Sequence, residues 1–393
     1  MKLNRRSFAA AFVALALATT SPAAFAAASG DPILIGLSGP FTGGSGPMGI
    51  SMRDAARLAV AQINEKGGVL GRPLQLVERD DEAKNERGVQ VAQELIHNED
   101  IVAAVGIINT GVALASARFY NQAEVPLVTP GPSGSTLTEQ FGPGSYIFRV
   151  SLRDAIQAQI IADEAINRQG FKKVAILADS TNYGQLGRDD LVKELKERGI
   201  EPVAVEKFNI KDVDMTPQLL RAKDAGAEAI LTYGVGPELA QIANGMVKLG
   251  WKVPMVGSWT LSMPNFIESA GAAGEGTRMP QTFIIDDAKG KAKQFIDDFT
   301  AATGSDRIAG PVWAAQGYDT VLLVAAAIEQ AGSTEGPAIR DALENLQKPV
   351  EGVVMTYDKP FSHEDHEAFK DASYAVVGEI KDGRVVRAEA AQN

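Results

Sequence analysis

From residue 32 onward, the chain alternates short apolar runs with longer segments of helical periodicity. The apolar runs at 33–38, 101–108 and 125–129 have the length and continuity of buried parallel strands. Segments with the spacing of amphipathic helices, such as 51–66 and 112–121, lie between them. Strands that alternate with helices in this way predict a parallel sheet flanked by helices.

The same rhythm starts again after Arg153. We therefore expect an α/β protein with two similar lobes, each a doubly wound parallel sheet. The other elements expected in the first half are strands at 74–79 and 146–150 and a helix at 87–97. Those expected in the second half are helices at 155–169, 186–198, 238–249, 291–303, 318–330 and 337–346, and strands at 174–178, 203–208, 229–232, 254–257, 352–357 and 374–377.

The N-terminus has the pattern of a secretory signal peptide. Lys2, Arg5 and Arg6 precede an apolar stretch at 8–18, and Ala24-Phe25-Ala26 has the small-x-small form of a cleavage site. We expect residues 1–28 to be the signal, with cleavage after residue 26 or 28. The adjacent arginines leave both Sec and twin-arginine export open. A periplasmic location follows from this expectation.

The amino-acid composition excludes several classes of function. The 393 residues include no cysteine, which excludes disulfides and thiolate chemistry. The formal charge is −11, and removal of three basic leader residues makes the mature chain still more acidic. An acidic surface argues against nucleic acid and anionic membranes as partners. We expect a monomer without a cofactor.

Two polar clusters follow neighbouring strands of the first expected sheet. Asn109 and Thr110 come after the run at 101–108, and Ser133 lies in the Gly/Pro-rich loop after 125–129. The carboxyl ends of adjacent parallel strands are the usual ligand site of such sheets, and a helix start offers free N–H groups to an anion. The clusters hold no charge or histidine, so they predict binding rather than catalysis. Alternatively, Thr110 and Ser133 serve only as caps.

Several segments together resemble the branched-chain amino acid binding proteins that deliver solutes to ABC importers. They are Ile63-Asn64-Glu65-Lys66-Gly67-Gly68, Thr129-Pro130-Gly131, Asp179 to Gly184, Tyr233 to Glu238 and Gly317-Tyr318-Asp319. The resemblance covers nearly all of the mature chain. It implies a type I periplasmic binding protein fold, with two lobes joined by three crossovers around a cleft. The implied first lobe is 31–151 plus about 283–357, and the second is 152–282 plus about 358–393.

The resemblance also implies a binding site. Thr110 and Ser133, with the backbone at Gly131, match the positions that hold a ligand α-carboxylate in this family. Asn109 is expected to add an amide donor beside them. Tyr183 matches a second-lobe tyrosine that closes over the ligand.

The departures from the family pattern concern the rest of the ligand. Trp259 occupies the position of the acid that pairs with the ligand ammonium. Val235 replaces a tyrosine at another contact position, Gly234 beside it is also expected to contact the ligand, and Met48 replaces a first-lobe aromatic residue. With Trp313, these side chains predict an apolar wall. A buried ammonium without a partner is costly, which disfavours a standard amino acid. The alternative is that Trp259 is a plug and that Glu238 or Asp286 supplies the acid.

Other charged residues have less specific roles. Arg149 and Arg153 flank the first expected crossover, where an ion pair between the lobes is expected and contact with a second ligand carboxylate is the alternative. His363 and His366 enclose two acids, but a third metal ligand is not evident, so we expect a solvated loop. With three histidines in the chain, no Ser/His/acid triad can be assembled near Thr110.

We therefore expect a non-enzymatic periplasmic protein that captures a small organic acid, such as an aromatic or keto acid, and delivers it to an ABC permease in the inner membrane. Two alternatives stay open. The ligand of the first is a branched-chain or other apolar amino acid. In the second, the protein is a receptor that signals to a membrane sensor.

Overall fold

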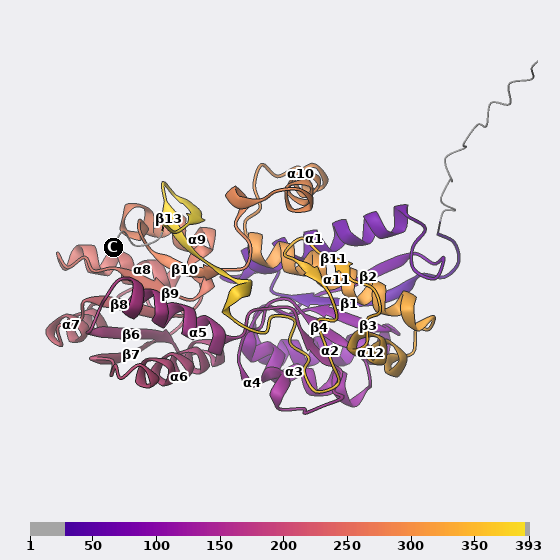
Figure 1. Cartoon of the computed structure of the whole chain (residues 1–393), viewed down its shortest axis with the longest axis horizontal. Helices are drawn as coiled ribbons and strands as arrows, with labels where there is room; N and C mark the ends of the chain where they lie inside the picture. Colours follow the sequence, from indigo (N-terminus) through magenta and orange to yellow (C-terminus); the bar gives the residue numbers. More distant parts are fainter. Residues whose placement is uncertain (1–27, 390–393) are drawn as a thin grey trace, which may run out of the picture.

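The computed structural model describes residues 28–389 and consists of two lobes, each built on one sheet (Figure 1). The first sheet has five parallel strands in the order β2-β1-β3-β4-β5. This is a doubly wound order, which leaves a crevice at the carboxyl ends of β1 and β3. The strands are β1 Ile33–Gly39, β2 Leu74–Asp80, β3 Ala103–Gly106, β4 Leu127–Thr129 and β5 Ile147–Arg149.

The second sheet has seven strands in the order β14-β13-β10-β9-β8-β6-β7. Its five parallel strands, β6 to β10, lie in the order β7-β6-β8-β9-β10 and so repeat the order of the first sheet, which confirms the expectation of two similar doubly wound lobes. β13 and β14 add an antiparallel hairpin at one edge. The strands are β6 Val174–Asp179, β7 Ala204–Phe208, β8 Ala229–Tyr233, β9 Met255–Gly257, β10 Arg278–Gln281, β13 Val376–Lys381 and β14 Arg384–Arg387.

Helices cover both faces of each sheet, so apolar side chains of the strands are buried from both sides (Figure 1). In the first lobe these helices are α1 Gly46–Glu65, α2 Asn85–Asn98, α3 Thr110–Gln122, α4 Thr136–Glu139, α10 Lys291–Thr303, α11 Pro311–Ala331 and α12 Gly336–Glu344. In the second lobe they are α5 Asp154–Ala162, α6 Asn182–Glu197, α7 Thr216–Asp224, α8 Pro237–Lys248 and α9 Pro264–Ala270.

α11 is the most apolar long helix of the described residues. By length and composition alone it would suit a membrane span, but 83% of its most apolar window is buried inside the protein. It packs against α1 and contributes Val312, Trp313 and Leu323 to the core of the first lobe. α11 is therefore a core helix.

The sequence pattern missed or misjudged several elements. The helix expected at 155–169 ends as α5 at Ala162 and continues as a π-helical segment, Asp163–Arg168. The strand expected at 352–357 is instead a two-stranded hairpin of β11 (Val350–Glu351) and β12 (Thr356–Tyr357). α4, α7, α9, β10 and β14 were not expected. β10 has no apolar run and contains Pro280, so its place in the sheet depends on its neighbours β9 and β13.

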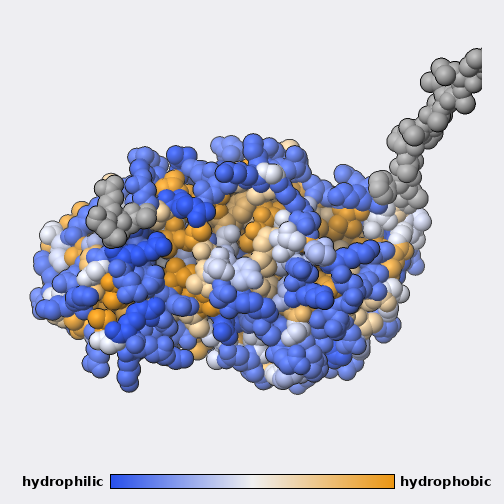
Figure 2. Space-filling view, viewed as in Figure 1, coloured by the Kyte–Doolittle hydropathy of each residue, from blue (hydrophilic) through white to orange (hydrophobic). Residues whose placement is uncertain are grey.

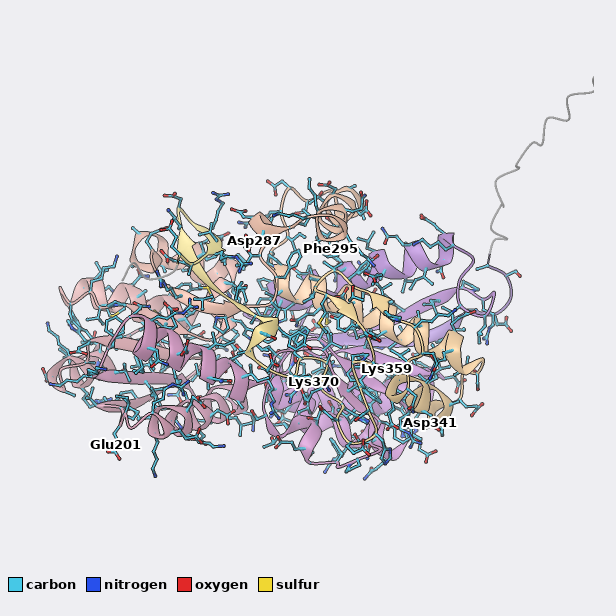
Figure 3. The ribbon with its side chains drawn as sticks, viewed as in Figure 1. Glu201, Asp287, Phe295, Asp341, Lys359 and Lys370 are labelled. Carbon is cyan, nitrogen blue, oxygen red and sulfur yellow. The ribbon has the colours of Figure 1, made fainter. Side chains whose placement is uncertain are left out.

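The last segment of the chain stays with the first lobe longer than expected. Phe361 and Phe369 belong to the core that contains β1, and the Ala368 N–H donates to the Arg149 carbonyl over 2.9 Å. The chain joins the second sheet only at β13. Lys370, labelled in Figure 3, lies in the connecting segment between the two lobes. We therefore propose that the third crossover starts after Phe369 rather than near residue 358.

The face shown in Figure 2 is hydrophilic over most of both lobes, and apolar residues gather along their junction. The junction is also where the crossovers run. Asp287, labelled in Figure 3, follows β10 and pairs with Arg387 of β14 over 2.8 Å. The signal peptide expected at residues 1–28 lies outside the described residues, apart from its last residue, Ala28.

Candidate ligand-binding site

The carboxyl ends of β3 and β4 bring the two polar clusters together. Thr110 begins α3, and its Oγ1 accepts a hydrogen bond from the Gly134 N–H at 3.2 Å, which ties the two clusters to each other. Only glycine fits at position 131, because a Cβ there would lie 2.6 Å from the Ile108 Cα. The loop after β4 therefore runs directly against the end of β3, and Ser133 sits beside Thr110.

One cavity between the lobes collects eight of the nine residues expected to bind the ligand. Its lining consists of Met48, Ile108, Asn109, Thr110, Gly131, Ser133, Tyr183, Val235, Trp259, Thr260 and Trp313. Among these residues there is no charged side chain. The remaining expected residue, Gly234, lies behind the lining, where its carbonyl accepts a hydrogen bond from Thr260 Oγ1 at 2.6 Å. Ile108 and Thr260 were not expected.

The lobes are closed over this cavity. Its volume is about 20 Å³, which is room for about one water molecule. Asn265 of the second lobe donates to the Gly44 carbonyl at 2.9 Å, and Ser135 of the first lobe donates to Asp190 at 2.7 Å. A second cavity of about 520 Å³ shares Asn109, Thr110 and Tyr183 with the first. Entry of an organic solute requires the lobes to separate or the lining to rearrange.

Three lining residues carry buried polar atoms that have no hydrogen-bond partner: Asn109 Oδ1, Ser133 Oγ and Tyr183 Oη. Such atoms are rare in folded proteins, because each one costs about 1–3 kcal/mol. Asn109 differs from expectation, since its amide nitrogen already donates to Ser45 Oγ at 3.1 Å. It offers the cavity an oxygen acceptor, whereas the two hydroxyls can donate.

The second-lobe part of the lining is positioned by Asp179 at the end of β6. Its carboxylate accepts hydrogen bonds from Thr181 Oγ1 and from the backbone N–H groups of Thr181 and Val235, at 2.5 to 3.0 Å. Thr181 in turn caps α6 by accepting from the Gly184 N–H. Burial raises the pKa of Asp179, and these hydrogen bonds oppose the rise. Asp179 thereby fixes the loop that carries Val235 and the helix start that carries Tyr183.

Trp259 and Trp313 form an apolar wall that joins the two lobes. Their ring centroids are 5.5 Å apart with an interplanar angle of 58°, and both side chains are buried. Trp259 begins a short 3-10 segment after β9, and its backbone N–H donates to Gln157 Oε1 at 3.2 Å. Such tilted aromatic pairs contribute about 0.5–1.5 kcal/mol beyond their buried area.

Neither of the acids considered as replacements for the missing family acid lines the cavity. Glu238 accepts from the Lys211 N–H at 2.6 Å, and Asp286 pairs with Arg384 at 3.0 Å. Both carboxylates are engaged elsewhere. That alternative is therefore wrong for these two residues.

Asp154 is a buried acid that lies behind the lining and was not expected near the site. It begins α5, is fully buried, and accepts a hydrogen bond from the Tyr233 hydroxyl at 2.9 Å. Burial raises its pKa to about 7, while the nearby hydroxyls of Ser133 and Tyr233 favour the charged form. Ser133 lies close enough to influence this charge, but without good hydrogen-bond geometry. In the sequence, an aspartate at a helix start looks like an ordinary partner of the helix dipole.

The arginines of the first crossover serve the fold. Arg149 is fully buried and makes two hydrogen bonds to the Glu367 carboxylate, at 2.7 and 2.6 Å, and one to the Gly134 carbonyl at 2.7 Å. Since Glu367 lies on the first lobe, this pair does not join the lobes, and Arg149 is not free for a second ligand carboxylate. Arg153 pairs with Glu139 at 3.2 Å near the surface.

The two late histidines share one carboxylate. His363 Nδ1 and His366 Nε2 lie 3.2 and 3.1 Å from the two oxygens of Glu344. His366 is buried and stacks on Phe148, so the expectation of a solvated loop is wrong for this residue. Burial lowers the pKa of His366. Within residues 28–389, no group of three or more metal-ligating side chains is arranged to hold a metal.

Known proteins share this architecture. Residues 32–384 match the sequence model of the family described as periplasmic binding protein. Leu/Ile/Val-binding protein homolog 3 of Brucella melitensis is 28% identical over 334 residues, which cover 84% of this chain and 88% of the relative. A branched-chain amino acid transporter substrate binding protein from Streptococcus pneumoniae, solved with isoleucine, is 27% identical with a TM-score of 0.80, covering 92% of this chain and 99% of the other.

A more distant structure shares the fold alone. It is the solute binding protein of an ABC transporter from Rhodopseudomonas palustris in complex with 3,4-dihydroxy benzoic acid, with 24% identity, a TM-score of 0.77, and coverage of 92% of this chain and 96% of the other. These likenesses cover 84% to 92% of this chain and so include both sheets. Because the family match runs through both lobes, the chain belongs to the periplasmic binding protein family and is a binding protein rather than an enzyme.

Proposed function

We propose that this protein is the periplasmic substrate-binding component of an ABC importer, and that its ligand is a small organic acid without an α-ammonium group. The observation that carries the proposal is that the cavity lining has a polar part with hydroxyl groups and an apolar part with two tryptophans. The unpartnered hydroxyls of Ser133 and Tyr183 can donate to a carboxylate. The Trp259–Trp313 pair provides an apolar surface for an aromatic or aliphatic group.

Charge supports the choice of an acid over an amino acid. An ammonium group needs an anionic partner when it loses its water, and the lining residues include none. A carboxylate, in contrast, is held well by hydroxyls and by the free N–H groups at the start of α3. Lobe closure then excludes water from the bound acid. A permease would recognise the closed pair of lobes.

The test compares two ligands that share a carbon skeleton. Purified protein is unfolded and refolded to remove any carried ligand, then titrated by calorimetry with 4-methyl-2-oxopentanoate and with leucine. We expect the keto acid to bind at least 100-fold more tightly than leucine, because an unpaired ammonium costs several kcal/mol on burial. 4-Hydroxybenzoate extends the panel to aromatic acids. Equal or tighter binding of leucine would overturn the proposal.

The second candidate ligand is a branched-chain or other apolar amino acid. It is favoured by the relatives, since the Brucella melitensis homolog is named for leucine, isoleucine and valine and the Streptococcus pneumoniae structure contains isoleucine. In this chain, the ammonium partner would have to be Asp154 behind Ser133. The same titration separates the two candidates.

A further inference from the structure

We propose that Asp154 is a further residue of the binding site and that it carries a proton whenever a ligand carboxylate is bound, so that binding takes up one proton where Asp154 is ionised in the free protein. This inference rests on the proposed function, because it takes the ligand to be an organic acid. It concerns a residue that does not line the cavity but lies directly behind the residues that do.

The position of Asp154 connects it to both halves of the site. α5 begins at the junction of the lobes (Figure 1), and the Asp154 N–H donates to the Ser133 carbonyl at 2.7 Å. Asp154 Oδ1 accepts from Tyr233, whose ring packs against Tyr183 with centroids 5.1 Å apart. Gln157, one turn along α5, accepts from the backbone N–H of Trp259. Asp154 is thus linked to three lining residues: to Ser133 through its own backbone N–H, to Tyr183 through Tyr233, and to Trp259 through Gln157.

Unpartnered atoms mark the space between Asp154 and the ligand. Asp154 Oδ2 is buried without a hydrogen-bond partner, and so are Ser133 Oγ and Tyr183 Oη. Three polar atoms of one small region therefore lack partners in the closed protein. A protonated Asp154 could donate toward Ser133 and leave that hydroxyl's hydrogen for the ligand carboxylate. An ionised Asp154 would compete with the ligand for the same hydroxyl.

The charged groups around Asp154 do not neutralise an added negative charge. From β5, Arg149 favours the ionised form, but its guanidinium is already paired with Glu367. From α6, Asp190 opposes ionisation. Arg153, next in the chain, pairs with Glu139. From β8, the Tyr233 hydroxyl donates to the carboxyl. Tyr183 of α6 packs against the Tyr233 ring, and burial raises the pKa of both tyrosines well above its usual value. The Asp154 carboxylate and a bound ligand carboxylate would be two buried negative charges, and each disfavours the ionised form of the other.

The size of the effect follows from the pKa of about 7 for Asp154 in the ligand-free protein. If the residue is fully protonated in the complex, binding takes up about 0.9 proton at pH 8 and about 0.1 proton at pH 6. Affinity then falls about tenfold between pH 6 and pH 8. An amino acid ligand would reverse the sign, because its ammonium would be stabilised by ionised Asp154 and binding would release a proton.

The test is calorimetric titration with 4-methyl-2-oxopentanoate at pH 6 in phosphate and in Bis-Tris, and at pH 8 in phosphate and in Tris. The two buffers at each pH differ in ionisation heat, which reports the protons exchanged. The wild type should show the uptake given above. Asp154→Asn should bind without uptake and without pH dependence, since asparagine is neutral and of similar shape. Asp81→Asn is the matched control, because Asp81 is also fully buried, has an unpartnered oxygen and has a pKa of about 7. Its carboxylate accepts from the Ala83 N–H, which is not part of the cavity lining, whereas Asp154 is linked to three lining residues.

The outcomes separate this inference from the proposed function. Binding of the keto acid with no proton uptake at pH 8 would overturn the inference alone, and so would uptake that persists in Asp154→Asn. Proton release on leucine binding at pH 6, with no binding of acids, would overturn both. The wild-type measurement decides the question even if Asp154→Asn fails to fold.

Discussion

Replacement of Ser133 by alanine separates binding from stability. The Ser133 side chain is 1% exposed, and its hydroxyl has no hydrogen-bond partner in the closed protein. Its removal therefore breaks no hydrogen bond of the fold and takes away an unsatisfied buried group that costs about 1–3 kcal/mol. A hydrogen bond from the same hydroxyl to a ligand carboxylate contributes about 1.5–3 kcal/mol. We expect Ser133→Ala to bind the ligand about 10- to 150-fold more weakly, with unchanged or increased stability.

The assay is titration with 4-methyl-2-oxopentanoate or 4-hydroxybenzoate, together with urea denaturation of the ligand-free protein. Ser116→Ala is the control, because Ser116 is equally buried but its hydroxyl donates to the Val112 carbonyl within α3 at 2.7 Å. That variant should keep full affinity. An affinity loss below threefold for Ser133→Ala would refute the assignment of its hydroxyl to the ligand. A stability loss above about 1 kcal/mol would show that the hydroxyl serves the fold.

Three other perturbations test the rest of the scheme. Trp259→Glu should weaken organic acid binding, because it puts a negative charge on the apolar wall. Titration with organic acids and with leucine will show whether the preference for acids over leucine reverses. Unchanged acid affinity would show that Trp259 does not belong to the site. Arg149→Met should lower the unfolding free energy by about 3–5 kcal/mol, because it leaves Glu367 with a buried charge that has no partner. Arg149→Met combined with Glu367→Gln should recover most of this lost stability, as measured by urea denaturation. Burial raises the pKa of Asp81 and Asp154 to about 7, so the folded state holds these protons more tightly than the unfolded state. The unfolding free energy should therefore fall as pH rises from about 4 to 7. Asp81→Asn should make this fall less steep, because the variant has one such group fewer. A stability that rises over this range would contradict the last expectation.

Local sequence determined most of the framework, because buried parallel strands are continuous apolar runs and their helices carry a 3.6-residue period. The strand at 174–178 and the helix at 291–303 agree with β6 and α10 almost residue for residue. β10 was missed because Arg278 and Pro280 interrupt any apolar run, and only pairing with β9 and β13 makes the segment a strand. The π-helical turn at Asp163–Arg168 also has no local signal that distinguishes it from α-helix.

The sequence by itself identified the polar strand ends at Asn109, Thr110 and Ser133, because hydroxyl and amide residues that directly follow apolar runs must lie at the edge of the sheet. Only the tertiary structure decided what surrounds them. It places Trp313 of the first lobe against Trp259 of the second, engages Arg149 with Glu367, and sets Asp154 behind Ser133. The physical reason is that burial and charge pairing arise from segments far apart in the chain, which come together only when both lobes have formed.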